Sequence, residues 1–361
     1  MKTGLTTALI LALVLTCVAC FSQTVVLREA PGLVFLSSTD SNSPAFWDGD
    51  KFYILNSNGG PKRSEGKDQF SLGNNTQGVY DNADKIKDGR WMECAWRTDD
   101  GVLYGWYHRE TGGVCPDRGL PIGLVVPSIG AARSTDNGLH WTDLGLILQS
   151  RPDSMHCDAQ NGFFAGGNGD CSCMLSKDGK YIYFFFGAYA GAVTEQGIGT
   201  ARMLWKDRDK PVGKVYKYNR GEWNEPGLGG RLSPVFPASV DWKRSTPDSF
   251  WGPAPHWNTY LGKYVMLLNR TRRKWWSQEG VYITYSDDIS DPGNWSTPRK
   301  ILNGGRMYPQ VLGVDAKAKE TDKLAGHQAR FYMGGLSDME IVFFKESEDT
   351  TNLPPVYAPG K

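Results

Sequence analysis

Short runs of strand-forming residues alternate with turn residues along most of the chain. Paired runs around a Gly-containing turn, the pattern of a β-hairpin, occur at 43–56, 93–107, 170–186 and 252–269. A third run follows three of these pairs, at 129–134, 197–203 and 280–286. A weaker fifth unit spans 308–314, 327–335 and 340–344. The chain is therefore an internal repeat of hairpins with added strands.

Five units of about four strands predict an all-β fold, a five-bladed β-propeller. A run at 24–36 would add the outer strand of the last blade and close the ring. No linker separates the units, so residues 23–361 are predicted to form one domain, with insertions at 58–89, 207–248 and 315–325. A β-sandwich would also explain alternating runs, but not a hairpin that is repeatedly followed by a third strand.

The first 22 residues have a different pattern. Lys2 precedes an apolar run at 5–19, which is shorter than the roughly 20 residues that span a bilayer. This pattern predicts a signal peptide cleaved after Ser22, or alternatively a lipoprotein signal that ends at Cys17 or Cys20. We expect a secreted or periplasmic monomer without a transmembrane segment, or an outer-membrane lipoprotein.

Composition narrows the class of protein. With 40 Lys+Arg against 39 Asp+Glu, the chain lacks the basic surplus that a nucleic-acid partner requires. Its 43 Gly and 13 Trp suit tight turns and short strands. Five cysteines follow the signal peptide, so one or two disulfides can form and at least one thiol remains. We expect most of these cysteines to be small buried residues.

Candidate chemistry follows from the propeller geometry. The starts of the inner strands, and the turns between second and third strands, meet at one mouth of the central channel. We expect catalytic carboxylates there, and the candidates are Glu93, Asp170, Asp40 and Glu279. The candidate substrate-binding residues are Trp91, Trp106, His108, Trp251, His256, Trp257 and Gln310.

This set of side chains suits glycoside hydrolysis. One carboxylic acid protonates the leaving oxygen, while a carboxylate activates water or attacks the anomeric carbon. Crowded carboxylates push their pKa values apart and so separate acid from base. We assign Glu93 as the acid, Asp170 as the base or pKa-tuning residue, and Asp40 as the other carboxylate. Sugar rings would stack on the aromatic side chains at the mouth.

Several features have structural interpretations beside these functional ones. Asp40 lies in a Ser- and Asn-rich stretch typical of loops, and His256 could be a buried histidine with satisfied partners. The turn at 134–141 is predicted to be a folding motif, whose Asp braces the turn while its Trp packs between strands. We expect no cofactor. Binding of a Ca²⁺ or other ion in the channel is kept as an alternative, although no loop offers a series of oxygen ligands close together in the sequence.

The blade pattern resembles that of the five-bladed propeller glycosidases of the arabinanase, β-xylosidase and invertase superfamily, including glycoside hydrolase family 43. The resemblance implies a pKa-tuning Asp at Asp170, ahead of Lys177-Asp-Gly-Lys-Tyr181. It aligns the family's general base with Ser43, before Pro44, and the family's acid with Trp251, before Gly252-Pro253. Glu93 or Glu279 would then supply the acid from a neighbouring blade.

The chain also resembles secreted bacterial proteins described as glycosyl hydrolases. The shared strings are Tyr104-Gly-Trp-Tyr-His108, Asp207-Arg-Asp-Lys-Pro211, Phe250-Trp-Gly-Pro253 and Tyr308-Pro-Gln310.

Our main hypothesis is a secreted glycosidase acting on a plant or microbial glycan. The alternatives are a non-catalytic carbohydrate-binding propeller, a sialidase-like enzyme using Arg133, Arg202 and Arg330, and a lyase using His256 on an acidic sugar.

Overall fold

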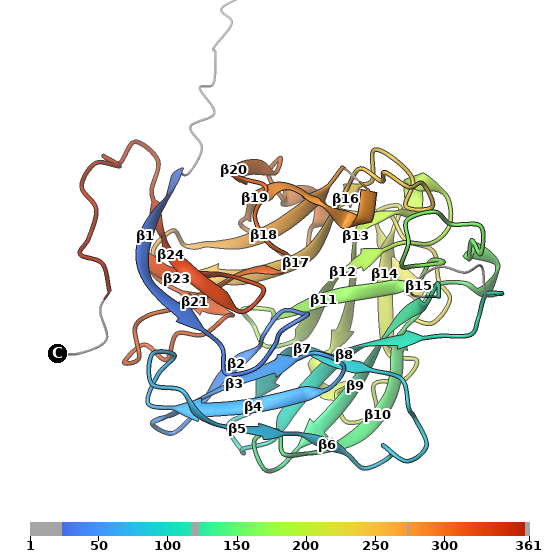
Figure 1. Cartoon of the computed structure of the whole chain (residues 1–361), viewed down its shortest axis with the longest axis horizontal. Helices are drawn as coiled ribbons and strands as arrows, with labels where there is room; N and C mark the ends of the chain where they lie inside the picture. The colour runs from blue at the N-terminus through green and yellow to red at the C-terminus, as the bar shows by residue number, and fades with distance from the viewer. Residues whose placement is uncertain (1–23, 117–122, 273, 358–361) are drawn as a thin grey trace, which may run out of the picture.

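The computed structural model describes residues 24–116, 123–272 and 274–357. The predicted signal peptide, with Cys17, Cys20 and the cleavage site, lies outside these residues. Five sheets of mainly antiparallel strands form the blades of a β-propeller arranged around a central axis (Figure 1). The predicted fold class is therefore confirmed.

The first two blades run from the inner strand outwards. Blade 1 consists of β2 (Ala45–Asp48), β3 (Lys51–Ser57), β4 (Pro61–Gly66) and β5 (Gly73–Gln77). Blade 2 consists of β7 (Arg90–Arg97), β8 (Leu103–Thr111), β9 (Val126–Ser134) and β10 (His140–Leu148), with β6 (Val79–Tyr80) at its outer edge.

The other three blades follow the same order. Blade 3 consists of β11 (Asn168–Leu175), β12 (Tyr181–Ala188), β13 (Gly197–Leu204), β14 (Val215–Asn219) and β15 (Glu222–Pro226), with β16 (Phe236–Pro237) paired to β13. Blade 4 consists of β17 (Ser249–Asn258), β18 (Lys263–Thr271), β19 (Gln278–Ser286) and β20 (Arg299–Asn303), with β22 (Leu324–Ala325) beside β17. Blade 5 consists of β21 (Pro309–Gly313), β23 (Gln328–Met333), β24 (Leu336–Phe344) and β1 (Thr24–Val34).

Short 3₁₀ turns occur in the connections between strands. They are η1 (Pro152–Ser154), η2 (Val193–Glu195), η3 (Trp205–Asp207), η4 (Lys274–Trp276) and η5 (Pro292–Asn294). None of these helices within the described residues is long and apolar enough to cross a membrane.

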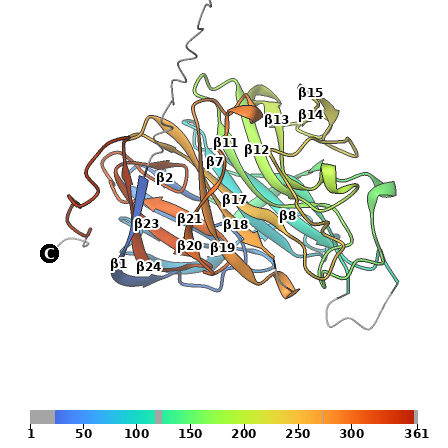
Figure 2. The same ribbon diagram turned by 90° about the horizontal axis from the view of Figure 1, so that it is seen from above.

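The N-terminal strand closes the ring, as the sequence predicted. β1 pairs antiparallel with β24, from Thr24 opposite Phe344 to Val34 opposite Leu336, and the two strands lie side by side in both views (Figures 1 and 2). Blade 5 thus contains strands from both ends of the chain. A buried cluster that includes Phe52 of blade 1 and Tyr332 of blade 5 seals the same junction.

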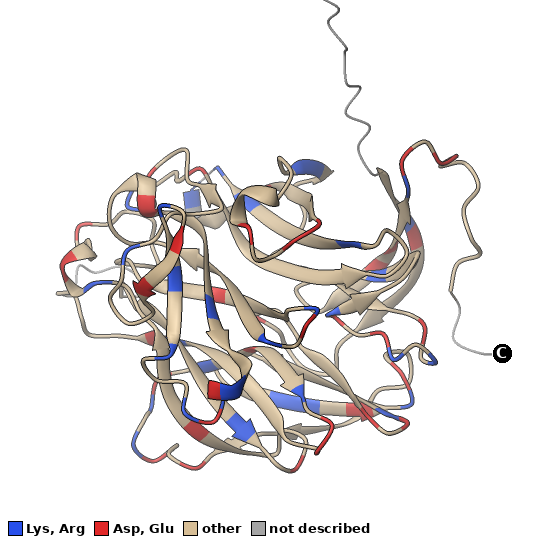
Figure 3. Cartoon of the chain, turned by 180° about the vertical axis from the view of Figure 1, so that it is seen from behind, with Lys and Arg blue, Asp and Glu red and all other residues tan. Residues whose placement is uncertain are grey.

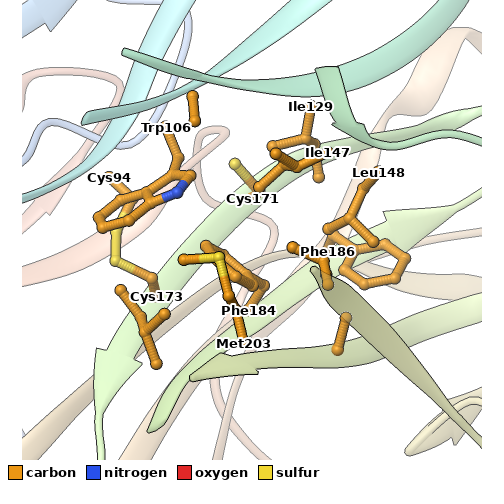
Figure 4. Packing of buried hydrophobic residues seen from close by; sticks show 14 of the residues in the cluster. Cys94, Trp106, Ile129, Ile147, Leu148, Cys171, Cys173, Phe184, Phe186 and Met203 are labelled. Atoms are coloured by element: carbon orange, nitrogen blue, oxygen red, sulfur yellow. A yellow bond between two sulfur atoms is a disulfide. The ribbon is translucent and has the colours of Figure 1, made fainter. Parts of the chain in front are cut away.

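Buried apolar clusters fill the interfaces between neighbouring blades. Between blades 2 and 3, Trp106 packs edge-on against Phe184 (Figure 4). A disulfide between Cys94 on β7 and Cys173 on β11 ties these two inner strands together, and Figure 4 shows it beside Trp106.

The cysteines confirm one prediction and meet another in part. A second disulfide joins Cys115 to Cys157, and Cys171 is the free, buried thiol among the described residues. Two disulfides with one remaining thiol match the count. The expectation that most cysteines are small buried residues is met in burial, since Cys94, Cys171 and Cys173 lie in the core, but four of the five are in disulfides and are not free thiols.

Two predicted insertions turn out to contain strands. The segment 58–89 holds β4, β5 and β6, and the segment 207–248 holds β14, β15 and β16. The sequence pattern missed them because outer strands are polar: β5 reads Gly-Asn-Asn-Thr-Gln and is largely exposed. Basic and acidic residues are interspersed over the ribbon (Figure 3).

Candidate active site

Three ionisable side chains from two neighbouring blades meet at one mouth of the channel. Glu93 lies on β7, His108 on β8 and Asp170 on β11. One ligand atom from each lies within 4.8 Å of the other two. Glu93 is 1% exposed, Asp170 2% and His108 3%. A charged group is costly at such burial unless it is paired or used, so this cluster is the leading candidate for function.

Asp170 is held by hydrogen bonds from three sides. Its backbone is left-handed, with φ 46°, a conformation that costs a non-Gly residue on the order of 1–3 kcal/mol. Its N–H donates to His108 Nδ1 at 3.0 Å, Tyr308 OH donates to Oδ1 at 2.9 Å, and Tyr189 OH donates to Oδ2. Burial raises the pKa of Asp170, while His108 and the two tyrosine bonds act to lower it.

Glu93 is less fully bonded than Asp170. Its Oε2 accepts the N–H of Cys171, whereas Oε1 has no hydrogen-bond partner within the described residues. Burial and then the charge of Asp170 raise the pKa of Glu93 to about 8, although His108 and the Cys171 bonds oppose this. A carboxyl group with this pKa holds its proton at neutral pH, as a general acid must.

His108 connects the two carboxyl groups. Its Nδ1 lies 3.8 Å from Glu93 Oε1 and 3.9 Å from Asp170 Oδ1, and its Nε2 lies 3.4 Å from Glu110 Oε1. Burial works to lower the pKa of His108, but Glu110 and the other two carboxyl groups raise it to about 9. Because Nδ1 accepts the Asp170 N–H, the ring can gain a second proton only by giving up that bond.

Asp40 is the more accessible carboxyl group at this mouth. It is half-buried, and its backbone N–H donates to Ser57 O at 2.8 Å. Burial and then the charges of Asp170 and Glu110 raise the pKa of Asp40, while His108 lowers it. Asp40 is therefore electrostatically coupled to the buried cluster. The sequence-based expectation that Asp40, Glu93 and Asp170 converge is met.

Aromatic rings cover the Asp170 side of the site. Tyr189 and Tyr308 belong to a buried cluster whose other ring members are Phe164, Trp242, Trp251 and Trp276. Trp276, on the turn between β18 and β19, lies 5.0 Å from Trp251 and 5.6 Å from Tyr189 between ring centroids. Trp91 contacts His108 at 5.6 Å. These rings fix the tyrosines that bond Asp170.

Two of the expected sugar-stacking residues have structural positions instead. Trp106 is 1% exposed and packs in the core between blades 2 and 3. Alternate residues of a strand face opposite sides, so His108, two residues further on, points to the same side of β8 as Trp106. His108 lies at the mouth, whereas Trp106 lies deeper along the strand. Trp251 is fully buried beneath Trp276 and Tyr308, so it supports the site and offers no free face to a sugar.

His256 and Gln310 also differ from the expectation. His256 is fully buried near the C-terminal end of β17, where burial and then Lys323 lower its pKa to about 3. Gln310 accepts from Ser43 N–H at 2.6 Å and donates to Ser43 O at 2.9 Å. Both amide atoms of Gln310 thereby join blade 5 to blade 1, and neither is free for substrate.

Glu279 and Trp257 lie away from the carboxylate cluster. Glu279, on the third strand of blade 4, pairs with Lys300 and accepts from Tyr282 OH at 2.7 Å. Burial acts to raise the pKa of Glu279, but these two hydrogen bonds outweigh it and lower the value. Trp257 lies at the far end of β17, against Tyr264 and Lys177, and so belongs to the opposite mouth.

The cluster of Glu93, His108 and Asp170 is also the one candidate metal-binding group found among the described residues. Its donor atoms fit a cation poorly as they stand. His108 Nδ1 already accepts a backbone N–H, and both Asp170 oxygens accept tyrosine protons. Ca²⁺ takes six to eight oxygen ligands, and among the carboxylate oxygens of this cluster only Glu93 Oε1 lacks a hydrogen-bond partner within the described residues.

The sialidase-like alternative requires convergent arginines, and these do not meet. Arg330 is buried against Ser337 in blade 5, Arg202 lies over Tyr181 and Trp223, and Arg133 pairs with Asp209.

Two solved structures of known proteins superpose on this chain. A thermostable family-43 glycoside hydrolase superposes with a TM-score of 0.54 at 13% identity, covering 92% of this chain and 99% of the other. An endo-arabinase from Bacteroides thetaiotaomicron VPI-5482 gives 0.50 at 12% identity, covering 87% and 96%. This chain therefore shares the fold of these two proteins. No protein-family model and no curated protein sequence matches the chain, so the likeness concerns the fold and the chemistry must come from the site.

Sequence reasoning missed the residues that hold the cluster. Tyr189 and Glu110 were not among the candidates, Tyr308 was placed at the mouth without a role, and His108 was expected to bind substrate. The string Tyr308-Pro-Gln310 and the end of β8 at His108-Arg-Glu110 were the available signals. Neither string shows that its side chains face Asp170, which lies more than 50 residues away from both.

Proposed function

We propose that this chain is an exported glycoside hydrolase that cleaves a plant or microbial glycan at the mouth containing Glu93 and Asp170. The observation that carries the proposal is the asymmetry of this buried pair. Asp170 receives hydrogen bonds from two tyrosines, which favour its anion against the effect of burial, while Glu93 Oε1 has no hydrogen-bond partner within the described residues. The family-43 type of fold and the two disulfides, which suit an oxidising compartment, support it.

In the proposed reaction, the proton of Glu93 passes to the glycosidic oxygen as the bond from that oxygen to the anomeric carbon breaks. Asp40 accepts a proton from the water that attacks the anomeric carbon. The two tyrosines favour the ionised form of Asp170, whose charge adds to burial in raising the pKa of Glu93. Because Glu93 is 1% exposed, its side chain must turn toward the mouth when the glycan binds.

The test is a released-sugar assay on a panel of plant and microbial polysaccharides. Glu93→Gln should lower kcat/KM by about 10²–10⁴-fold, the range for loss of a general acid. Glu279→Gln is the matched control, because Glu279 lies on the same side of the propeller but pairs with Lys300. Equal activity of the wild type and Glu93→Gln would refute the proposal.

A second candidate, a non-catalytic glycan-binding propeller, is favoured by two residues. Ser43 and Trp251 stand where the resemblance puts the family's base and acid, and both are buried. Glycan binding without any released sugar would select this alternative.

A further inference from the structure

A separate cavity lies at the opposite mouth of the channel. Each inner strand runs from the carboxylate cluster toward this end: Glu93, Trp96 and Arg97 follow one another on β7. A cavity of about 560 Å³ opens here, a volume typical of small-ligand sites. Its walls come from the ends of β2, β7, β11 and β17 and from the blade 5 loop at 319–324. All five blades therefore contribute to it.

The cavity walls combine aromatic rings with cations. The rings are Phe46, Trp47, Trp96, Trp257 and Tyr264, and the three tryptophans are partly exposed. The cations are Arg97, Lys177, Lys319 and Lys323, against the single lining carboxylate Asp99. The flat apolar faces of the rings suit the apolar face of a sugar ring. The neighbouring cations suit a carboxylate group on the same sugar.

Lys177 is the cation that remains available. Arg97 pairs with Asp48, Lys319 with Asp50, and Lys323 with Asp322. Lys177 is exposed on the hairpin after β11, and no ion pair to it is found among the described residues. Its Nζ lies 3.9 Å from the ring centroid of Trp257 and 5.3 Å from that of Tyr264. An unpaired ammonium group over an indole is a ready position for a ligand carboxylate.

We propose that this far mouth is a second glycan-binding site, selective for uronate-containing oligosaccharides, in which Lys177 binds the sugar carboxylate and Trp257 contacts the apolar face of the sugar. This second site rests on the proposed function only in that both sites bind glycans. It would hold the enzyme on an acidic polysaccharide while the other mouth acts.

The experiment measures binding by calorimetry to the full mature protein, with trisaccharides of galacturonate, glucuronate and mannuronate. Galactotriose is the neutral control. At least one uronate trisaccharide should bind, with affinity that falls as salt rises. Lys177→Ala and Trp257→Ala should each weaken binding about tenfold or more. Lys180→Ala should not, because Lys180 is on the same hairpin but outside the cavity lining.

Three results would overturn the proposal: binding of none of the uronates, equal binding of galactotriose, or unchanged affinity in Lys177→Ala. The Glu93→Gln variant separates this site from the proposed activity. It should bind uronates as the wild type does, even though its kcat/KM for sugar release is strongly lowered. If hydrolysis proves absent but uronate binding depends on Lys177, only the catalytic proposal fails.

Discussion

The two mouths of the channel are built from opposite ends of the same inner strands, yet they differ in burial and charge. At one mouth, Glu93, His108 and Asp170 are buried beside packed aromatic rings. At the other, partly exposed tryptophans and cations line an open cavity. Position along a strand of about eight residues therefore decides whether an aromatic ring supports a buried carboxylate or faces solvent.

The largest expected effect tests the difference between buried and mouth aromatics. Trp106→Ala should lower the free energy of unfolding by about 3–5 kcal/mol, because it leaves a cavity between blades 2 and 3. Trp257→Ala, at the open mouth, should cost clearly less. Guanidinium unfolding of both variants measures this, and equal losses would contradict the placement of Trp106.

The tyrosines that bond Asp170 should matter more to activity than to folding. Tyr308→Phe removes a hydrogen bond to a charged group, worth about 1.5–3 kcal/mol, so kcat/KM should fall roughly 10- to 100-fold. The proton of Glu93 would then shift toward Asp170. Tyr332→Phe is the control, because its buried hydroxyl donates to Gln69 instead. Activity that survives Tyr308→Phe unchanged would show that Asp170 does not depend on this bond.

The buried cluster should also make stability depend on pH. The pKa of Glu93 is raised from 4.5 to about 8, so the folded chain binds more protons than the unfolded chain between these values. Its contribution is complete below about pH 4.5 and is lost as pH rises through 8, with a slope of ~1.4 kcal/mol per pH unit.

A comparison of variants separates the contribution of Glu93 to this pH dependence of stability from the contributions of Asp170 and His108. Glu93→Gln should flatten the curve of unfolding free energy against pH between 5 and 8. Glu279→Gln should leave it unchanged there, because the pKa of Glu279 is lowered and its effect lies at more acid pH. Asp170 and His108, whose pKa values are also raised, should leave a smaller slope, so a slope in Glu93→Gln equal to that of the wild type would assign the proton to another group.

The smallest effect concerns the rim of the open mouth. Arg97 and Asp48 form an ion pair at 2.6 Å, with side chains 19% and 38% exposed. Solvent screens such pairs, so Asp48→Asn should change stability by less than about 1 kcal/mol in thermal unfolding. A loss of several kcal/mol would mean that this mouth is as tightly built as the other.

The fold was predictable because each blade repeats one local pattern. The hairpins at 43–56, 93–107, 170–186 and 252–269 all appear as β-strand pairs, and β1 closes blade 5 as expected. The outer strands escaped prediction since their residues face water on both sides. β5 shows this, because polar residues such as Asn74 and Thr76 leave no alternation to detect.

The site was predictable only in part, for a geometric reason. Glu93 and Asp170 could be identified because each carboxyl group begins an otherwise apolar inner strand. Whether Trp106 or His108 reaches the mouth depends on their depth along β8, and the partners of Asp170 depend on how loops pack. Tyr189 and Tyr308 come from different blades, and nothing in their local sequence indicates that both hydroxyls meet Asp170.

The account depends most on Glu93 holding a proton at neutral pH. Difference infrared spectroscopy of wild type against Glu93→Gln measures this directly through the carbonyl stretch of a protonated carboxylic acid. The account predicts a band at pH 7 that is lost in Glu93→Gln, kept in Glu279→Gln, and titrates with a midpoint of about 8. A band that is already absent at pH 7, with a midpoint near the ordinary value of 4.5, would contradict it.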